Sequence, residues 1–342
     1  MAVEQGRGRA TMKQVAALAG VSLKTVSRVV NSEPFVSPEV ISRVQDAAQR
    51  LNYRPNLTAS SLRRADGRTR TVGLLLENVA NPFSAALHRA IEDVAHERGV
   101  VVLAGSVDED PVRERELVTA FSNRRVDGLI VVPSGGDQSY LAAERSAGTA
   151  LVFVDRPPQF LDADVVLVAN RAGAEAATTH LIERGHRRIA FLGDNPDIYT
   201  AAERFAGYTD ALAHAAIPVD EAIVRRGLHS SDASLQAQLD LMSTAHPPTA
   251  VFTGQNLITV GAIKALRQLG RHRTTALVGF DDMALAELLD PGVTVVAQDT
   301  NAMGALAAEL LFRRIDGDER PTERCVLATR IVTRGSGELR PT

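Results

Sequence analysis

The chain has 342 residues, no tryptophan, a single cysteine and a formal net charge of −3. At ~150 residues per domain, this length predicts two or three compact units. No stretch approaches the ~18 consecutive apolar residues of a membrane-spanning helix, and the polar first ten residues lack the apolar core of a signal peptide. We therefore expect a cytoplasmic protein with no membrane partner.

The small total charge conceals two regions of opposite sign. Residues 1–70 carry 12 Lys and Arg against 5 Asp and Glu, a net of +7, whereas the rest of the chain carries 26 against 36, a net of −10. A basic head on an acidic body indicates a nucleic-acid-binding module fused to a domain that should not bind phosphate.

The first predicted elements are two short helices within residues 11–31, TMKQVAALAGVSLKTVSRVVN. Thr11 and Gln14 have the spacing of a capping box, and Gly20 gives the turn between the helices its backbone freedom. Ser22 can cap the second helix, which repeats valine at i, i+3 and i+4 on one face. That face is predicted to be core.

The opposite face of the second helix presents Leu23, Lys24, Ser27 and Arg28. This mixture of apolar, hydroxyl and cationic groups can meet thymine methyls, phosphates and guanine edges in a DNA groove. The simpler alternative, a helical hairpin that only caps a domain, does not account for the basic charge of the region. The pattern therefore predicts a DNA-reading helix-turn-helix.

A third helix follows, with Ser37 as its cap and Pro38 at its first position. Beyond it, small residues at 58–61 lead into Leu62-Arg63-Arg64 before Asp66-Gly67 breaks the pattern. Because an isolated helix shorter than about 12 residues is marginal in water, we expect this last segment to form a helix only when something packs against it.

This region resembles the head and hinge of the lactose-repressor (LacI/GalR) family of bacterial transcription regulators, through the words VAALAGVSLKTVSRVVN, VSPEVISRV, LNYRPN and TASSL. The resemblance implies a pseudo-palindromic double-stranded DNA operator as partner. It implies base contacts from Leu23, Lys24 and Arg28, backbone contacts from Thr25, Ser27, Tyr53 and Asn56, and minor-groove contacts from Ala59 and Leu62 of the hinge. The alternative for Leu62 is simple packing between hinge and body.

From Thr71 onward, short apolar runs alternate with helical segments, which predicts parallel sheets covered on both faces. The runs are VGLLL, VVLAGS, DGLIVV, ALVFVD, RRIAFLGD, TAVFTG and TALVGFDD. Several end in polar residues, namely 78–81, 133–134, 155–156, 193–194, 255–256 and 281–282. Ligands bind outside the carboxyl ends of such strands, so these tips are the first place to look for a site.

The common catalytic and nucleotide-binding motifs GxGxxG, GxxxxGK[ST], GxSxG and HExxH are missing from the sequence. Cys325 lies in an apolar run and is most simply a buried core thiol. His180 and His186 have no cysteine or carboxylate company at ligand spacing, which favours structural roles. We therefore expect no enzyme activity, no cofactor and no metal.

The body resembles the two-lobed, periplasmic-binding-protein-like body of the same family over Thr71 to Arg334, through NPF, RRVDGLIVVPS, FVDRP, GHRRIAFLGD, ERFAGY and VGFDD in order. The resemblance implies an α/β fold that closes on a small effector. It places Asp155 and Arg156 at the lobe crossing and Gln298 where the chain crosses back. The implied effector-binding residues are Asn81, Phe83, Asp155, Arg156, Arg204, Gln255, Asn256, Asp281 and Gln298.

This set suits a sugar or polyol, because Asp and Arg satisfy the donor and acceptor sides of neighbouring hydroxyls while Phe83 covers an apolar face. The alternative for Arg204 and Asp281 is a structural ion pair. The family usually has Ser-Asn-Asp or Ala-Asn-Asp where this chain has Gly254-Gln255-Asn256. An amide thus replaces the usual carboxylate, which leaves the effector's identity open.

The resemblance divides the chain into a head (1–56), a hinge (57–68) and a body (69–342). The first lobe comprises about 70–167 and 298–322, and the second about 168–297 and 323–342. Two heads must sit about 34 Å apart on half-sites, so we expect a homodimer, and the absence of a heptad tail favours it over a tetramer. Lobe closure would fold or melt the hinge helices.

Our hypothesis is a repressor of a carbohydrate or polyol operon that an inducer releases; a corepressor effect is equally compatible with the residues. Two alternatives stay open. The body could dock a phosphorylated carrier protein, as in catabolite-control regulators, or the chain could be a cytoplasmic sugar-binding protein without a DNA role.

Overall fold

The computed structural model describes residues 10–30, 33–54 and 67–341. The chain separates into two compact units, residues 1–69 and 70–342, each of which is described by itself. The predicted hinge segment, including Ala59 and Leu62, falls largely outside the described residues, as does Asn56. In the described part of the chain, no helix is long and apolar enough to span a membrane.

The head consists of three helices around a small core of alanine and valine. They are α1 (Met12–Ala19), α2 (Leu23–Val30) and α3 (Pro38–Arg50). The predicted capping box is confirmed, because Thr11 accepts from the backbone N–H of Gln14 and the Gln14 side chain accepts in return. Gly20 adopts the left-handed conformation with φ 64°. The fully buried core residues are only medium-sized, with Val15, Val26 and Val44 at its centre.

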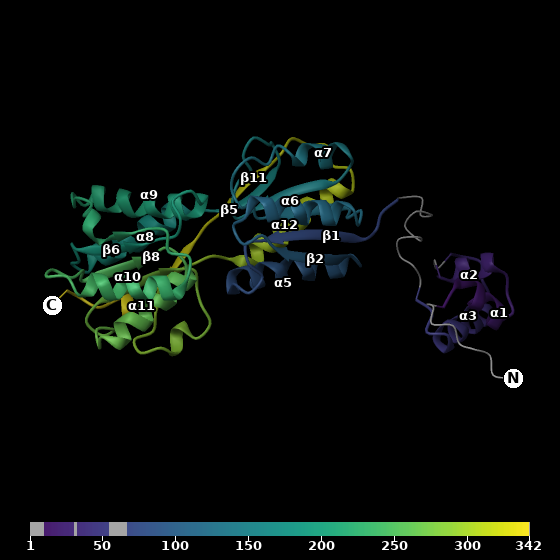
Figure 1. The fold of residues 1–342 in the computed structure, drawn as a ribbon, viewed down its shortest axis with the longest axis horizontal. Helices are drawn as coiled ribbons and strands as arrows, with labels where there is room; N and C mark the ends of the chain where they lie inside the picture. The colour runs from purple at the N-terminus through teal and green to yellow at the C-terminus, as the bar shows by residue number, and fades with distance from the viewer. Residues whose placement is uncertain (1–9, 31–32, 55–66, 342) are drawn as a thin grey trace. The chain divides into compact units, whose positions relative to one another are not determined.

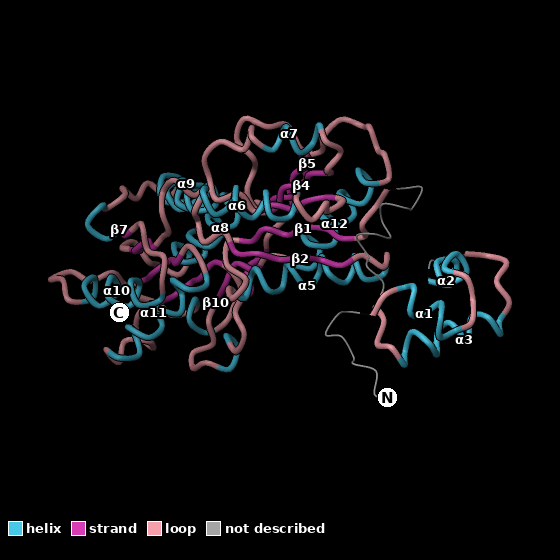
Figure 2. Tube along the Cα trace, turned by 45° about the vertical axis from the view of Figure 1, so that its right-hand side comes forward, coloured by secondary structure: helices cyan, strands magenta, loops and turns pink. Residues whose placement is uncertain are grey.

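The first lobe of the body is a six-stranded parallel sheet in the order β11-β5-β4-β3-β1-β2. Alternate residues of its strands face two separate cores, with Leu74 and Leu76 on one side and Leu75 on the other. In Figure 2, α6 and α7 lie on one side of these strands and α5 on the other. The elements are β1 (Thr71–Leu76), α5 (Pro82–Glu97), β2 (Val101–Ser106), α6 (Pro111–Ser122), β3 (Gly128–Val131), α7 (Leu141–Ser146), β4 (Ala150–Val154), β5 (Asp164–Val168), α12 (Thr300–Ile315) and β11 (Arg324–Leu327).

The second lobe repeats this plan with a sheet in the order β12-β10-β9-β8-β6-β7, parallel except for β12, which runs antiparallel to β10. Cores again lie on both faces, one beneath α8 and α9 and the other beneath α11. The elements are α8 (Asn170–Glu183), β6 (Ile189–Leu192), α9 (Tyr199–His214), β7 (Val224–Arg225), α10 (Ser231–Met242), β8 (Ala250–Thr253), α11 (Asn256–Gln268), β9 (Ala276–Phe280), β10 (Thr294–Ala297) and β12 (Arg330–Val332).

The chain passes between the lobes three times, and the yellow C-terminal part accordingly appears in both (Figure 1). The first two passages follow β5 and β10, close to the expected boundaries. The third lies later than expected. Residues 323–342 were assigned to the second lobe, but β11 pairs with β5 in the first sheet and only β12 joins the second. Both strands are short and partly exposed, so their sequence does not reveal which sheet each one completes.

The C-terminal segment packs into the second lobe and accounts for the two histidines. His180 Nε2 lies 3.2 Å from the carbonyl oxygen of Gly337, and His186 Nε2 lies 2.9 Å from that of Leu339. Both imidazoles therefore have structural hydrogen bonds, as the sequence favoured. Cys325 differs from expectation because it is only partly buried, on the edge strand β11.

Candidate functional site

The head presents the predicted reading residues on α2. Leu23, Lys24 and Arg28 are exposed, while Thr25 and Ser27 are half-buried. The backbone N–H of Thr25 donates to Ser22 Oγ at 3.1 Å, which confirms Ser22 as the cap of this helix. The valine face of α2 packs in the head core, so Leu23, Lys24 and Arg28 lie on the exposed side of the helix. Their contacts with DNA stay predictions.

Two details qualify the predicted DNA contacts. Arg28 Nε lies 3.6 Å from the Glu33 carboxylate, with both side chains about half exposed, so this ion pair is weak. Tyr53 packs partly against the head core.

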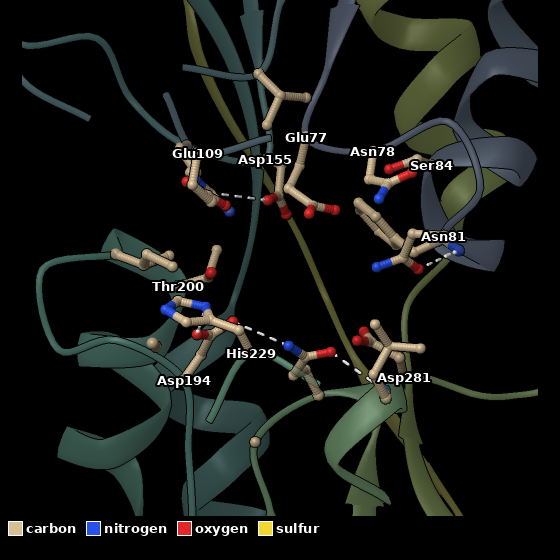
Figure 3. A pocket seen from close by; sticks show the side chains of 18 of the residues that line it. Glu77, Asn78, Asn81, Ser84, Glu109, Asp155, Asp194, Thr200, His229 and Asp281 are labelled. Carbon is tan, nitrogen blue, oxygen red and sulfur yellow. Dashed lines mark hydrogen bonds and ion pairs between the residues drawn. The ribbon is translucent and has the colours of Figure 1, made fainter. Parts of the chain in front are cut away.

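A cavity of about 370 Å³ lies between the two lobes of the body. The ends of β1, β4, β6, β8, β9 and β10 surround it, as expected for the carboxyl ends of parallel strands. Figure 3 shows Glu77, Asp155 and Asn81 of the first lobe opposite Asp194, His229 and Asp281 of the second. Eight of the predicted effector residues line it: Asn81, Phe83, Asp155, Arg156, Arg204, Gln255, Asp281 and Gln298.

Asp155 and Asp281 occupy equivalent positions in the two lobes. Each follows the last residue of a buried strand and adopts a left-handed backbone, with φ 70° and 71°. Their N–H groups donate to Val166 and Val296 of the neighbouring strands, both at 2.9 Å. This conformation is uncommon for a non-glycine residue and is typical of functional sites. Asp155 and Arg156 thus lie at the end of β4 and not at the lobe crossing that we expected, which follows β5.

Arg156 makes three hydrogen bonds to two partners. Its guanidinium donates twice to Glu109, at 2.7 and 2.6 Å, and once to the carbonyl oxygen of Pro133 at 3.2 Å. Burial opposes its charge, but the hydrogen bonds and negative charge of Glu109 outweigh that effect and raise the pKa of Arg156. This arginine is therefore a fixed cation in a buried, neutralised pair.

A buried carboxylate supports this arrangement from behind. Glu114 of α6 is 1% exposed and accepts from the N–H and hydroxyl of Ser134, at 2.6 and 2.8 Å, and from the hydroxyl of Tyr140 at 2.8 Å. Ser134 follows Pro133, and Glu109 lies just before α6. Glu114 therefore ties together both segments that hold Arg156.

Arg204 is also engaged within its own lobe. It donates to Asn170 and to the carbonyl oxygen of Gly254, each at 2.8 Å, and its guanidinium stacks 3.8 Å from the Phe280 ring centre. Its Nη1 lies 3.7 Å from the Asp281 carboxylate. The structural ion pair considered from the sequence is thus present, although both residues also line the cavity.

Asn256 departs from the prediction because it does not line the cavity. It is 3% exposed at the start of α11, and its Nδ2 donates across the cleft to Asn81 Oδ1 at 2.8 Å. The same oxygen accepts from the N–H of Phe83, which makes Asn81 the cap of α5. These two amides join the lobes directly.

The cavity contains several residues that sequence reasoning missed: Glu77, Ser84, Asp108, Glu109, Thr200 and His229 among them. Asp194 had been noted only as a strand end; it pairs with His229 at 2.6 Å and accepts from Gln255 at 2.9 Å. The position of Glu77 directly after β1 could have identified it as a cavity residue. No strand ends just before His229, which lies in the loop between β7 and α10, so the sequence does not indicate that it reaches the cavity.

Two carboxylates of the cavity have pKa values above their ordinary range. Burial is the main cause for Asp155, although Arg156 and Arg204 oppose it. Burial also raises the pKa of Glu77, and the charge of Glu109 adds to the effect. Such perturbed groups in a cleft are typical of ligand sites.

Comparisons with known proteins agree with this architecture. Residues 11–56 match the family described as bacterial regulatory proteins, lacI family, and residues 178–337 match the periplasmic binding protein-like domain. The chain is 33% identical over 330 residues to the ribose operon repressor of Escherichia coli K12, covering 96% of this chain and 99% of that protein.

Two solved structures are similar over nearly the whole chain. One is a CelR–cellobiose complex, with 33% identity, a TM-score of 0.70 and coverage of 96% of this chain and 100% of that one. The other is the lac repressor dimer bound to operator and the anti-inducer ONPF, with 26% identity, a TM-score of 0.83 and coverage of 97% and 100%.

Proposed function

The chain belongs to the lacI family of bacterial regulatory proteins. We propose that it is a transcriptional repressor whose affinity for its operator is controlled by a sugar-like effector. The observation that supports this most directly is the interlobe cavity, with strained aspartates at equivalent strand ends of both lobes. A carbohydrate or polyol operon is the proposed target, and the cytoplasm is the proposed location. We propose no catalytic role.

Two similar proteins indicate the kind of effector. One is named for the ribose operon, and the other was solved with cellobiose. In this chain, carboxylates and amides can bind neighbouring hydroxyls while Phe83 packs on the ring. Asn81, Asp155, Arg156, Arg204, Gln255, Asp281 and Gln298 are the proposed contacts, and Asn256 has the separate task of joining the lobes.

The proposed mechanism couples lobe closure to the heads. Direct hydrogen bonds cross the cleft from Asn256 to Asn81 and from Arg324 to Tyr199, so a ligand that changes the lobe angle must break or strengthen them. A coupling free energy of ~1–3 kcal/mol is enough to change operator affinity appreciably. We propose that the effector acts as an inducer that releases the operator.

A homodimer is the proposed assembly, by analogy with the lac repressor structure, which is a dimer on its operator. Two copies present two heads, and half-sites about 34 Å apart require both. Lys24, Leu23 and Arg28 are the proposed base contacts, with Thr25, Ser27, Tyr53 and Asn56 on the backbone and Ala59 and Leu62 in the minor groove.

Operator titration by gel shift with a panel of pentoses, hexoses, disaccharides and polyols tests the proposal. The operator can be sought as a palindrome near the gene. At least one compound should shift the titration of the native chain, and the same compound should not shift that of Asp155→Asn, which retains the head. Indifference of the native chain to every compound would contradict effector control, and absence of salt-dependent duplex binding would contradict the repressor role.

A further inference from the structure

Carboxylates dominate the charged lining of the cavity. The described residues place six of them there against two arginines and one histidine; the carboxylates are Glu77, Asp108, Glu109, Asp155, Asp194 and Asp281. An effector must therefore enter a site in which negative charge exceeds positive charge.

The two arginines pair with two of these six carboxylates, Glu109 and Asp281. Asp108 pairs with Arg113 outside the lining, so Glu77, Asp155 and Asp194 carry the remaining negative charge. Arg156 makes its paired hydrogen bonds to Glu109, and its Nε lies 3.6 Å from Asp155. Arg204 donates to an amide and a carbonyl oxygen, with Asp281 beside it. A phosphate or carboxylate usually binds to the free fork of a guanidinium. Glu109 occupies the fork of Arg156, and Nε and Nη1 of Arg204 are engaged within the protein.

Two acceptors beside the cavity, Asp155 Oδ1 and Gln298 Oε1, are buried without a hydrogen-bond partner among the described residues, as is one donor, Arg156 Nε. The free oxygen of Asp155 can accept a hydrogen bond from a donor on the ligand. A hydroxyl group provides one, whereas an ionised phosphate or carboxylate provides only further acceptors.

The opposite wall adds further negative charge. Glu77 projects into the cavity toward the second lobe, where Asp194 accepts from Gln255 and pairs with His229 (Figure 3). Burial is the main cause of the raised pKa of Glu77; the negative charges of Glu109 and Asp194 add to it, while Arg156 and Asn81 oppose it. These carboxylates would repel a negatively charged ligand in a partly desolvated site.

We propose that the effector is a polyhydroxylated compound without an anionic group, and that Glu77, Asp155 and Asp194 form a charge filter that excludes sugar phosphates and sugar acids. This inference rests on the proposed function and narrows its ligand class. Asp155 receives a ligand hydroxyl, while Glu77 and Asp194 set the charge limit from the two lobes.

Matched ligands test the filter. Calorimetric titration of the full-length protein would use ribose, glucose, galactose, cellobiose and several polyols, beside ribose 5-phosphate, glucose 6-phosphate, galactose 6-phosphate and gluconate, at constant ionic strength. The best neutral compound should bind at least 100-fold more tightly than its phosphate or acid. A phosphorylated or acidic compound that binds as tightly as its neutral parent overturns the inference, although effector control could still stand.

If no neutral compound binds, both the inference and the proposed function are overturned.

The variant Glu77→Gln tests which residues form the filter. It should reduce discrimination against the phosphate about tenfold while changing affinity for the neutral sugar only a few-fold. Asp194→Asn should act in the same direction, so the conclusion does not depend on one variant folding well.

Glu116→Gln is the matched control, because it removes the same charge from the exposed face of α6. It should leave the discrimination unchanged. If Glu116→Gln alters discrimination as much as Glu77→Gln and Asp194→Asn do, overall charge is responsible and the filter is wrongly assigned. Unchanged discrimination in both cavity variants would overturn the assignment as well.

Discussion

The head and the interlobe cavity both depend on charged side chains, but they hold them in opposite ways. In the head, Lys24 and Arg28 stand exposed on a helix whose other face closes a small core of valine and alanine. In the cavity, Arg156 and Arg204 are buried and held by carboxylates, amides and carbonyl oxygens. The cations of the head are exposed to solvent, whereas the cations of the cavity are already bound to other groups of the protein.

This difference predicts which property each substitution affects. An exposed cation contributes little to folding, so its loss should change partner binding alone. A buried cation within a network contributes to folding and to the site together, because its removal leaves carboxylates without a counter-charge. The following experiments test that separation.

The largest effect should follow Arg156→Met. The variant leaves the buried Asp155 and the partly buried Glu109 without their cation, and breaking a buried pair typically costs about 3–5 kcal/mol. Urea unfolding of the body should show this loss in the free energy of unfolding. Adding Glu109→Gln to Arg156→Met should recover part of the lost unfolding free energy. If Arg156→Met alone were as stable as the native chain, Arg156 would be less constrained than its contacts indicate.

A second experiment concerns the head. Lys24→Ala should weaken operator binding about 10- to 100-fold, the usual range for a cation that contacts a base edge. Effector affinity and body stability should not change, since Lys24 is exposed and distant in sequence from the cavity residues. Gel shift and calorimetry measure the two properties separately, with Lys264→Ala as a control on an exposed body helix. Equal weakening by both variants would indicate a general charge effect.

The interlobe bond offers a smaller test. Asn256→Asp keeps an oxygen for the N–H of Leu257 but replaces the donor to Asn81 with an acceptor. Losing the donor costs about 1 kcal/mol, and the new carboxylate also faces the Asn81 oxygen, so effector affinity should fall at least about fivefold if the bound form is the closed one. Asn123→Asp, the same change at an exposed helix end, is the calorimetric control. Tighter effector binding in Asn256→Asp would mean that the effector favours separated lobes.

The smallest effect is a pH dependence confined to the body. Burial lowers the pKa of His186, which donates to Leu339 and accepts from Thr249. The folded form therefore binds fewer protons than the unfolded form near pH 6.5, so this contribution is present above pH 6.5 and is lost as the pH falls through the lowered pKa.

His186→Gln should make the fall in unfolding free energy between pH 7 and pH 5 less steep than in the native chain. His246→Gln, at an exposed position, is the control variant. The head contains no histidine, so its own unfolding transition should show no such effect. An unchanged slope in His186→Gln would contradict the structural role of that imidazole.

Sequence patterns revealed the elements that are locally encoded. The caps at Thr11, Ser22 and Ser37 and seven apolar strand runs were all identified, because hydrophobic periodicity and capping act within a few residues. Five strands, β5, β7, β10, β11 and β12, were not among the predicted runs. Three of these, β7, β11 and β12, have only two to four residues and depend on a neighbouring strand, so local sequence contains little information about them.

The sequence by itself determined the two-part organisation, the charge asymmetry and most of the side chains at the cavity, because strand ends and their polar residues are adjacent along the chain. Only the tertiary structure decided how those side chains are used. In the structure, Asn256 bonds to Asn81 and does not line the cavity, His229 pairs with Asp194, and Glu109 neutralises Arg156. Those contacts join segments far apart in sequence, and their energies depend on burial, which no local pattern specifies.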